Sequence, residues 1–168
     1  NPGKLFASIN SELVDLMERF SCYFTAFYLS LDNRRRIVYT NGGHPSVYLL
    51  KPGRKKLYEL TTEGFFLGLT KEVNNKFQSR TREIESGDKI ILFSDGIIEA
   101  RNEKKEQYTT KRLVRAIIKN AFQNCETMKT HIIQDLDSFT GKTERKDDET
   151  LMIVEIKRTV RTKKRSKV

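Results

Sequence analysis

Three aspartates stand where this sequence could hold a divalent cation: Asp95, Asp147 and Asp148. Asp95 follows the apolar run 89–93 and precedes Gly96. A carboxylate there projects from the end of a rigid strand, where the backbone bends sharply, and such positions commonly hold metals and phosphates. The alternative is an aspartate that only caps the turn that follows.

The adjacent pair of Asp147 and Asp148 lies just before the last apolar run, 150–156. Two neighbouring carboxylates repel each other unless a cation or a basic group compensates their charge, which makes the pair a candidate for a hard cation. Arg145 and Lys146 could supply that compensation instead. If the two strands are neighbours, their carboxylates converge and would bind Mg²⁺ or Mn²⁺ weakly, with water completing the ligand set.

The elements that must position these carboxylates can be predicted from the hydrophobic pattern. Apolar residues at helical spacing predict a helix over 3–20 whose buried face carries Leu5, Ile9, Leu13, Leu16, Met17 and Phe20. Helices are also predicted around 113–122 and 128–139, and strands at 22–31, 36–40, 47–50, 56–60, 76–84, 89–93 and 150–156. We expect 22–60 to form one antiparallel meander and 89–93 to be a central strand. Strands dominate the first half of the chain, and two helices and a last strand follow. This order predicts an α+β sandwich and not an alternating βαβ fold.

Composition limits the classes of protein to consider. With 168 residues, 37% of them hydrophobic, the chain is long enough for one folded domain and has no apolar run that could span a membrane. Cys22 and Cys125 are too few for a disulfide framework, so we expect buried, reduced thiols and a cytoplasmic location. The net charge of +10 comes mainly from the end of the chain. We expect residues 158–168 to be a flexible, solvated basic tail. Nucleic-acid binding is not favoured, because no aromatic residue there could stack on a base.

Five ordered motifs resemble the PPM metal-dependent serine/threonine phosphatases (protein phosphatase 2C-like), and most closely their bacterial SpoIIE-type branch. The resemblance extends from about residue 5 to residue 156, and 1–157 is expected to be a partial PPM domain. The motifs are Phe-Thr-Ala-Phe-Tyr at 24–28, Asn-Gly-Gly-His-Pro at 41–45, Gly-Phe-Phe-Leu-Gly-Leu at 64–69, Phe-Ser-Asp-Gly-Ile-Ile-Glu-Ala-Arg-Asn at 93–102 and Asp-Asp-Glu-Thr at 147–150.

The resemblance implies an α-β-β-α sandwich of two antiparallel sheets flanked by helices, with Mn²⁺ or Mg²⁺ at one edge. A metal-activated water would then hydrolyse phosphoserine or phosphothreonine on a bacterial signalling protein, such as an anti-sigma-factor antagonist. Asp95 and Asp147 correspond to metal ligands, and Asp148 to an auxiliary ligand. Gly96 would keep the backbone close to the metal. The loop around His44 resembles a structural loop of the family.

One departure from the family matters for activity. The family's first metal motif, an Asp-Gly within a Gly-Asp-Val-Ser-Gly-His-Gly type of segment, is absent from the sequence. We therefore expect an N-terminally truncated domain that binds one ion weakly and is inactive by itself, with a regulatory domain upstream in a longer parent chain. An exposed strand edge would favour a homodimer. The alternative function is a catalytically inactive PPM-like module that binds a partner protein.

Overall fold

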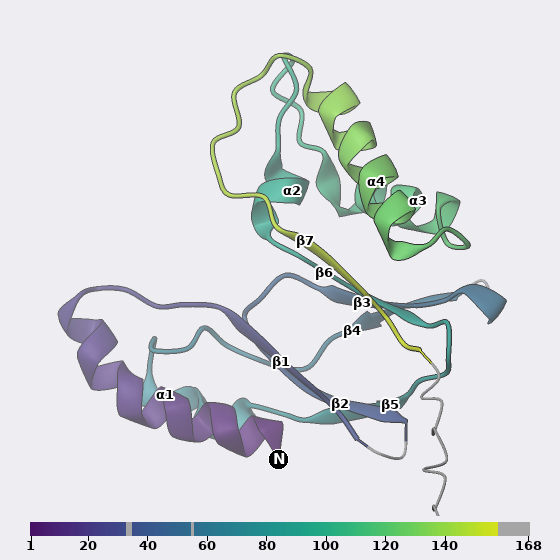
Figure 1. Ribbon diagram of the computed structural model, residues 1–168. Coiled ribbons are helices and arrows are strands. Elements are labelled where there is room, and N and C mark those ends of the chain that lie inside the picture. Colours follow the sequence, from purple (N-terminus) through teal and green to yellow (C-terminus); the bar gives the residue numbers. More distant parts are fainter. Residues whose placement is uncertain (33–34, 55, 158–168) are drawn as a thin grey trace, which may run out of the picture.

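The computed structural model describes residues 1–32, 35–54 and 56–157, and the predicted basic tail lies outside them. Figure 1 shows two layers of strands between helices, with α1 against one sheet and α3 and α4 over the other. The elements are α1 (Pro2–Arg19), β1 (Ala26–Leu31), β2 (Arg36–Gly42), β3 (Val47–Lys51), η1 (Pro52–Arg54), β4 (Lys56–Leu60), η2 (Lys71–Lys76), β5 (Arg80–Glu83), β6 (Lys89–Phe93), α2 (Asp95–Glu99), α3 (Thr109–Lys119), α4 (Cys125–Thr140) and β7 (Leu151–Glu155).

Both sheets are antiparallel, as the resemblance implied. One has the strand order β1-β2-β5 and the other β4-β3-β6-β7. Side chains of Ile37 in β2 and of Leu49 and Ile90 in the other sheet pack together in the core between the layers. On the outer face of the four-stranded sheet, Ile91 and Phe93 pack against α3 and α4. The prediction that 89–93 is a central strand covered on both faces is therefore confirmed.

The predicted antiparallel meander over 22–60 is wrong. The neighbours of β2 are β1 and β5, whereas β3 lies between β4 and β6 in the other sheet. The chain changes sheets in the loop 43–46, where Gly43 has a φ of 76°. β2 and β3 carry apolar side chains that face each other across the core, so the two strands lie in different layers and bury these side chains between them.

The helix predicted at the start of the chain is confirmed, but its predicted buried face is right only in part: Ile9, Leu13 and Met17 are half-buried. The buried side chains of α1 include Phe6, Asn10 and Val14, whereas Leu5, Leu16 and Phe20 are exposed. Asn10 can be buried because its side chain donates to the Thr70 carbonyl oxygen at 2.8 Å and accepts from the Gly68 amide at 2.7 Å. A buried amide with these partners costs little, so a search for apolar residues alone misses Asn10 on the buried side of the helix.

The strand predicted over 76–84 is shorter than expected. Only Arg80–Glu83 forms β5, and the preceding η2 is a 3₁₀ helix. Val73 and Phe77 are buried in one cluster with Phe6 of α1, and the Phe6 and Phe77 rings meet edge to face at 6.0 Å. The 3₁₀ turn places both side chains against α1, and the strand begins only after Phe77.

The expectation of two buried thiols is also wrong. Cys22 is exposed in the turn that follows α1, and Cys125 is partly exposed at the start of α4; both are free. Cys22 is exposed because it lies in the connection between the end of α1 and the start of β1. None of the helices in the described part of the chain is long and apolar enough to cross a membrane.

Tyr108 connects the two long helices over the four-stranded sheet, and it gives a testable pH dependence. It is fully buried, and its hydroxyl donates to Asp135 Oδ2 at 2.5 Å. Burial, together with that hydrogen bond and the charge of Asp135, raises the pKa of Tyr108 well above the ordinary tyrosine value. Because the unfolded chain ionises this phenol first, its contribution to stability is fully present below about pH 10 and is lost at higher pH.

We expect the free energy of unfolding of the wild-type chain to fall between pH 9 and 11 more steeply than that of Tyr108→Phe. Urea unfolding at half-unit pH steps measures both slopes. The other tyrosines and the lysines titrate in both proteins, so the difference isolates Tyr108. Equal slopes would contradict this prediction.

Candidate active site

Two strand ends bring the predicted aspartates together. β6 pairs with β7 in antiparallel register, with Phe93 opposite Leu151. Beyond that pair, the Ser94 amide donates to the Thr150 carbonyl oxygen at 3.0 Å, and the Ser94 hydroxyl donates to the Asp148 carbonyl oxygen at 2.9 Å. The same hydroxyl accepts from the Thr150 amide. Ser94 therefore ties the turn that carries Asp95 to the 147–150 segment.

Gly96 allows this close approach. A Cβ added at Gly96 would lie 2.5 Å from the Asp148 carbonyl oxygen, a separation that real Cβ atoms essentially never show. The φ of Gly96 is not in the left-handed region, so the requirement for glycine here is one of space. The structure thus places all four residues singled out from the sequence, Asp95, Gly96, Asp147 and Asp148, at one edge of the sandwich.

The carboxylates of Asp95 and Asp147 are exposed and available to a cation. Asp95 Oδ1 accepts from the Gly96 amide at 3.1 Å, and Asp147 Oδ1 accepts from the Asp148 amide at 2.8 Å. Among the described residues, Arg145 pairs with Asp137 and Glu149 and not with the aspartate pair. The hypothesis that Arg145 compensates the charge of Asp147 and Asp148 is therefore not supported.

The donor set suits a hard divalent ion. Mg²⁺ commonly takes one or two carboxylates and completes its octahedron with water, and Mn²⁺ accepts the same oxygen ligands. The described residues contain no group of three or more His, Cys, Asp or Glu side chains that could hold a metal. Asp95 and Asp147 are oxygen donors of the kind that a hydrated divalent ion takes, and the weak single-ion site stays a prediction.

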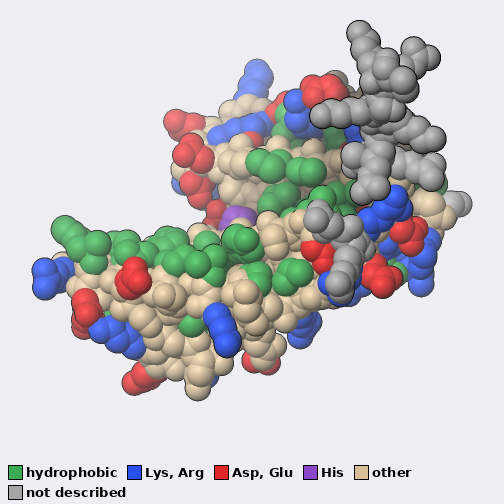
Figure 2. Space-filling model, turned by 60° about the horizontal axis from the view of Figure 1, so that its bottom comes forward, with side chains coloured by type: hydrophobic (Ala, Val, Ile, Leu, Met, Phe, Trp, Pro, Cys, Tyr) green, Lys and Arg blue, Asp and Glu red, His purple; other side chains and the backbone are tan. Residues whose placement is uncertain are grey.

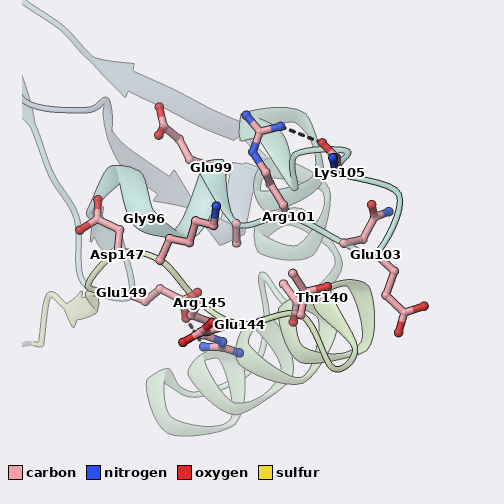
Figure 3. A pocket seen from close by; sticks show the side chains of 14 residues that line it. Gly96, Glu99, Arg101, Glu103, Lys105, Thr140, Glu144, Arg145, Asp147 and Glu149 are labelled. Atoms are coloured by element: carbon pink, nitrogen blue, oxygen red, sulfur yellow. Dashed lines mark hydrogen bonds and ion pairs between the residues drawn. The ribbon is translucent and has the colours of Figure 1, made fainter.

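A pocket of about 650 Å³ opens on one side of this edge, between the loop after α2 and the loop before β7. Figure 3 shows Gly96 and Asp147 at one end of it, and Arg101 and Lys105 joined by a hydrogen bond from the guanidinium to the Lys105 carbonyl oxygen. Glu149 also lines the pocket, with only 9% of its side chain exposed. Burial raises the pKa of the Glu149 carboxyl, although Arg145 beside it acts in the opposite direction.

A second hollow, of about 430 Å³, lies on the other side of the Asp95 turn. Figure 2 shows the molecule hollowed where its two layers separate, with a histidine and acidic side chains at the inner end. His44 lines this hollow together with Asp95. Burial lowers the pKa of His44, and the negative charge of Asp95 opposes that shift.

The sequence alone suggested only a structural loop at His44, and the structure adds the shared hollow. The sequence offered one hint of a functional position for His44. Residue 44 follows the end of one buried strand, and Asp95 follows the end of another. No pattern in the sequence says that these two ends meet, because β2 and β6 belong to different sheets.

Solved structures with similar folds define the class of protein. The SiaA-PP2C domain of Pseudomonas aeruginosa has a TM-score of 0.78 at 15% identity, covering 93% of this chain and 61% of that one. The Mn-presoaked phosphatase domain of SpoIIE from Bacillus subtilis has a TM-score of 0.65 at 15% identity, covering 92% of this chain and 66% of that one. The fold is therefore that of PP2C-type phosphatase domains.

The family follows from the sequence match. The family model described as stage II sporulation protein E (SpoIIE) matches residues 1–157, and the chain belongs to this family. The phosphoserine phosphatase RsbU of Bacillus subtilis is 26% identical over 104 residues, which are 61% of this chain and 30% of that protein. The chain thus spans less than a third of this curated relative. The recognised resemblance to the SpoIIE-type branch of the PPM phosphatases is confirmed.

Proposed function

We propose that this chain is part of a metal-dependent phosphatase domain that hydrolyses phosphoserine or phosphothreonine on a signalling protein. The observation that carries the proposal is the close packing of Gly96 against the Asp148 backbone, which brings Asp95 and Asp147 to one edge of the sandwich. The name of its relative RsbU, a phosphoserine phosphatase, supports the same reaction class. An anti-sigma-factor antagonist as the substrate and an upstream regulatory domain remain predictions, as do a homodimer and a cytoplasmic location.

In this proposal Asp95 and Asp147 hold Mn²⁺ or Mg²⁺, and Asp148 supports the site. A bound divalent ion supplies an activated water and neutralises charge on the phosphoryl group. The residues of the chain orient the site: Ser94 fixes the spacing of the two aspartate segments, and Gly96 keeps them in contact.

The experiment that tests this function compares the chain with its Asp95→Asn variant. Where the chain hydrolyses a phosphoserine peptide or p-nitrophenyl phosphate with Mn²⁺, we expect that activity to fall to background in Asp95→Asn. Mn²⁺ binding measured by calorimetry should weaken at least tenfold, the scale seen when groups around a metal are removed. Asp15→Asn is the matched control, because Asp15 lies in α1 and pairs with Lys71 on an exposed surface.

The calorimetric readout keeps the test informative when the chain alone turns over slowly. Joining the family's Asp-Gly segment to the N-terminus should then raise the rate. If the extended protein binds no Mn²⁺ and hydrolyses neither compound, the enzyme proposal is wrong and the inactive interaction module becomes the better explanation.

A further inference from the structure

The hollow that His44 shares with Asp95 contains the groups that a phosphoryl ligand would meet. Its lining includes His44, Asp95, Thr25, Ser46, Thr110 and Phe66. Asp95 carries the only negative charge among these side chains, so a cation at that carboxylate would favour the entry of an anion. The hollow and the proposed metal position are therefore parts of one site.

The loop that carries His44 is held firmly. Asn41 fixes it at both backbone groups: its side-chain amide donates to the His44 carbonyl oxygen at 2.9 Å, and its oxygen accepts from the His44 amide at 2.7 Å. Gly43 has a φ of 76°, and a Cβ added there would lie 2.7 Å from the Phe66 ring. The imidazole is thus presented by a loop with little freedom to move, which suits a group that must meet a ligand in a fixed geometry.

The ring of His44 is unused within the fold. Among the described residues, neither ring nitrogen of His44 has a hydrogen-bond partner, while its backbone is fully engaged. The other histidine of the sequence differs: His131 Nδ1 lies 2.6 Å from Asn120 Oδ1. A neutral imidazole always has one N–H to donate, and phosphoryl oxygens are strong acceptors.

We propose that His44 is a phosphate-contacting residue, with one ring N–H donating to a phosphoryl oxygen of the substrate in the hollow beside Asp95. The inference rests on the proposed phosphatase function and adds a residue to it. It requires no proton transfer by His44, only a hydrogen bond donated by a ring N–H. The structural role of the loop and this contact are compatible, because the backbone of His44 fixes the loop and the ring faces the hollow.

Nuclear magnetic resonance of the two histidine rings tests the contact without relying on turnover. Mg²⁺ is used because it is diamagnetic. In its presence we expect saturating inorganic phosphate, and separately a phosphoserine peptide, to shift the ring nitrogen signals of His44 and to leave those of His131 unchanged. The unphosphorylated peptide should shift neither. His131→Phe assigns the signals and serves as the matched control.

Binding to variants gives a second measurement. His44→Phe keeps the size of a ring and removes the N–H, and it should bind the phosphoserine peptide about tenfold more weakly in Mg²⁺, the scale of one lost hydrogen bond to a charged group. His131→Phe should bind like the wild type. Thermal unfolding of each variant verifies that it is folded, and the resonance experiment on the wild type remains decisive when His44→Phe is unstable.

Three results would overturn the proposal. Mg²⁺ alone could shift the His44 ring with no further change from phosphate, which would make His44 a metal ligand. Saturating phosphate could leave both rings unchanged, or His44→Phe could bind the peptide as well as the wild type. Failure of the phosphatase function looks different: the peptide would shift the His44 signals, but even the protein extended with the family's Asp-Gly segment would not hydrolyse it.

Discussion

Replacing Asp88 with alanine is expected to lower the free energy of unfolding by about 3–5 kcal/mol, the usual cost of breaking a buried ion pair. Asp88 Oδ2 lies 2.7 Å from Lys51 Nζ, and only 8% of the lysine side chain and 5% of the aspartate side chain are exposed. The same oxygen accepts from the Glu85 amide at 2.8 Å. The variant leaves a buried ammonium without its closest partner, since Glu85 is 3.9 Å from Lys51.

Urea unfolding checks this expectation against an exposed pair. Glu126→Ala removes the carboxylate of a solvent-exposed pair with Lys129 and should change stability by less than about 1 kcal/mol. The double variant Lys51→Met with Asp88→Leu should recover most of the loss, because apolar residues of similar size need no partner. The idea is wrong if Asp88→Ala costs no more than Glu126→Ala.

The pair matters for function because it fixes the far end of the two strands that carry the candidate site. Asp88 directly precedes β6, and its carbonyl oxygen accepts from the Ile156 amide just after β7 at 2.8 Å. Phe93 and Leu151 are paired at the opposite end of the same two strands. We therefore expect Asp88→Ala to disturb Asp95 and Asp147 by separating β6 from β7 along their whole length, and not by a change confined to the site.

The second large effect is expected at Gly96. Gly96→Ala places a Cβ 2.5 Å from the Asp148 carbonyl oxygen, so the backbone of the 147–148 segment must move away. We expect a loss of about 1–3 kcal/mol in stability, typical of overpacking. Mn²⁺ binding should weaken at least tenfold, because the two carboxylates no longer hold their spacing.

Calorimetric Mn²⁺ titration and thermal unfolding of Gly96→Ala measure the two effects separately. Gly53→Ala is the matched control, since a Cβ there meets nothing within 4 Å and the φ of Gly53 is not in the left-handed region. We expect the control to bind Mn²⁺ like the wild type and to have nearly unchanged stability. Unaltered Mn²⁺ binding by Gly96→Ala would show that the contact with Asp148 does not set the site.

Much of the local structure was encoded in short patterns. The apolar run of β6 predicted its burial on both faces, and a glycine, Gly141, ends α4 with a φ of 60°. The spacing of Asp95 and of the aspartate pair from the ends of two strands predicted that their segments meet, and the β6–β7 register brings them together. The burial of β6 and the end of α4 depend on residues within a few positions of one another, so periodicity and turn chemistry suffice to find them.

What the sequence determined by itself, then, was the set of elements, the family motifs and the aspartates at the two strand ends. Only the tertiary structure decided which strands share a sheet, which face of α1 is buried and what lies beside Asp95. The pairing of β2 with β5 joins segments about forty residues apart, and the burial of Asn10 depends on partners sixty residues away, near Thr70. Such choices depend on how well distant surfaces pack and satisfy their polar groups, and no local pattern records that.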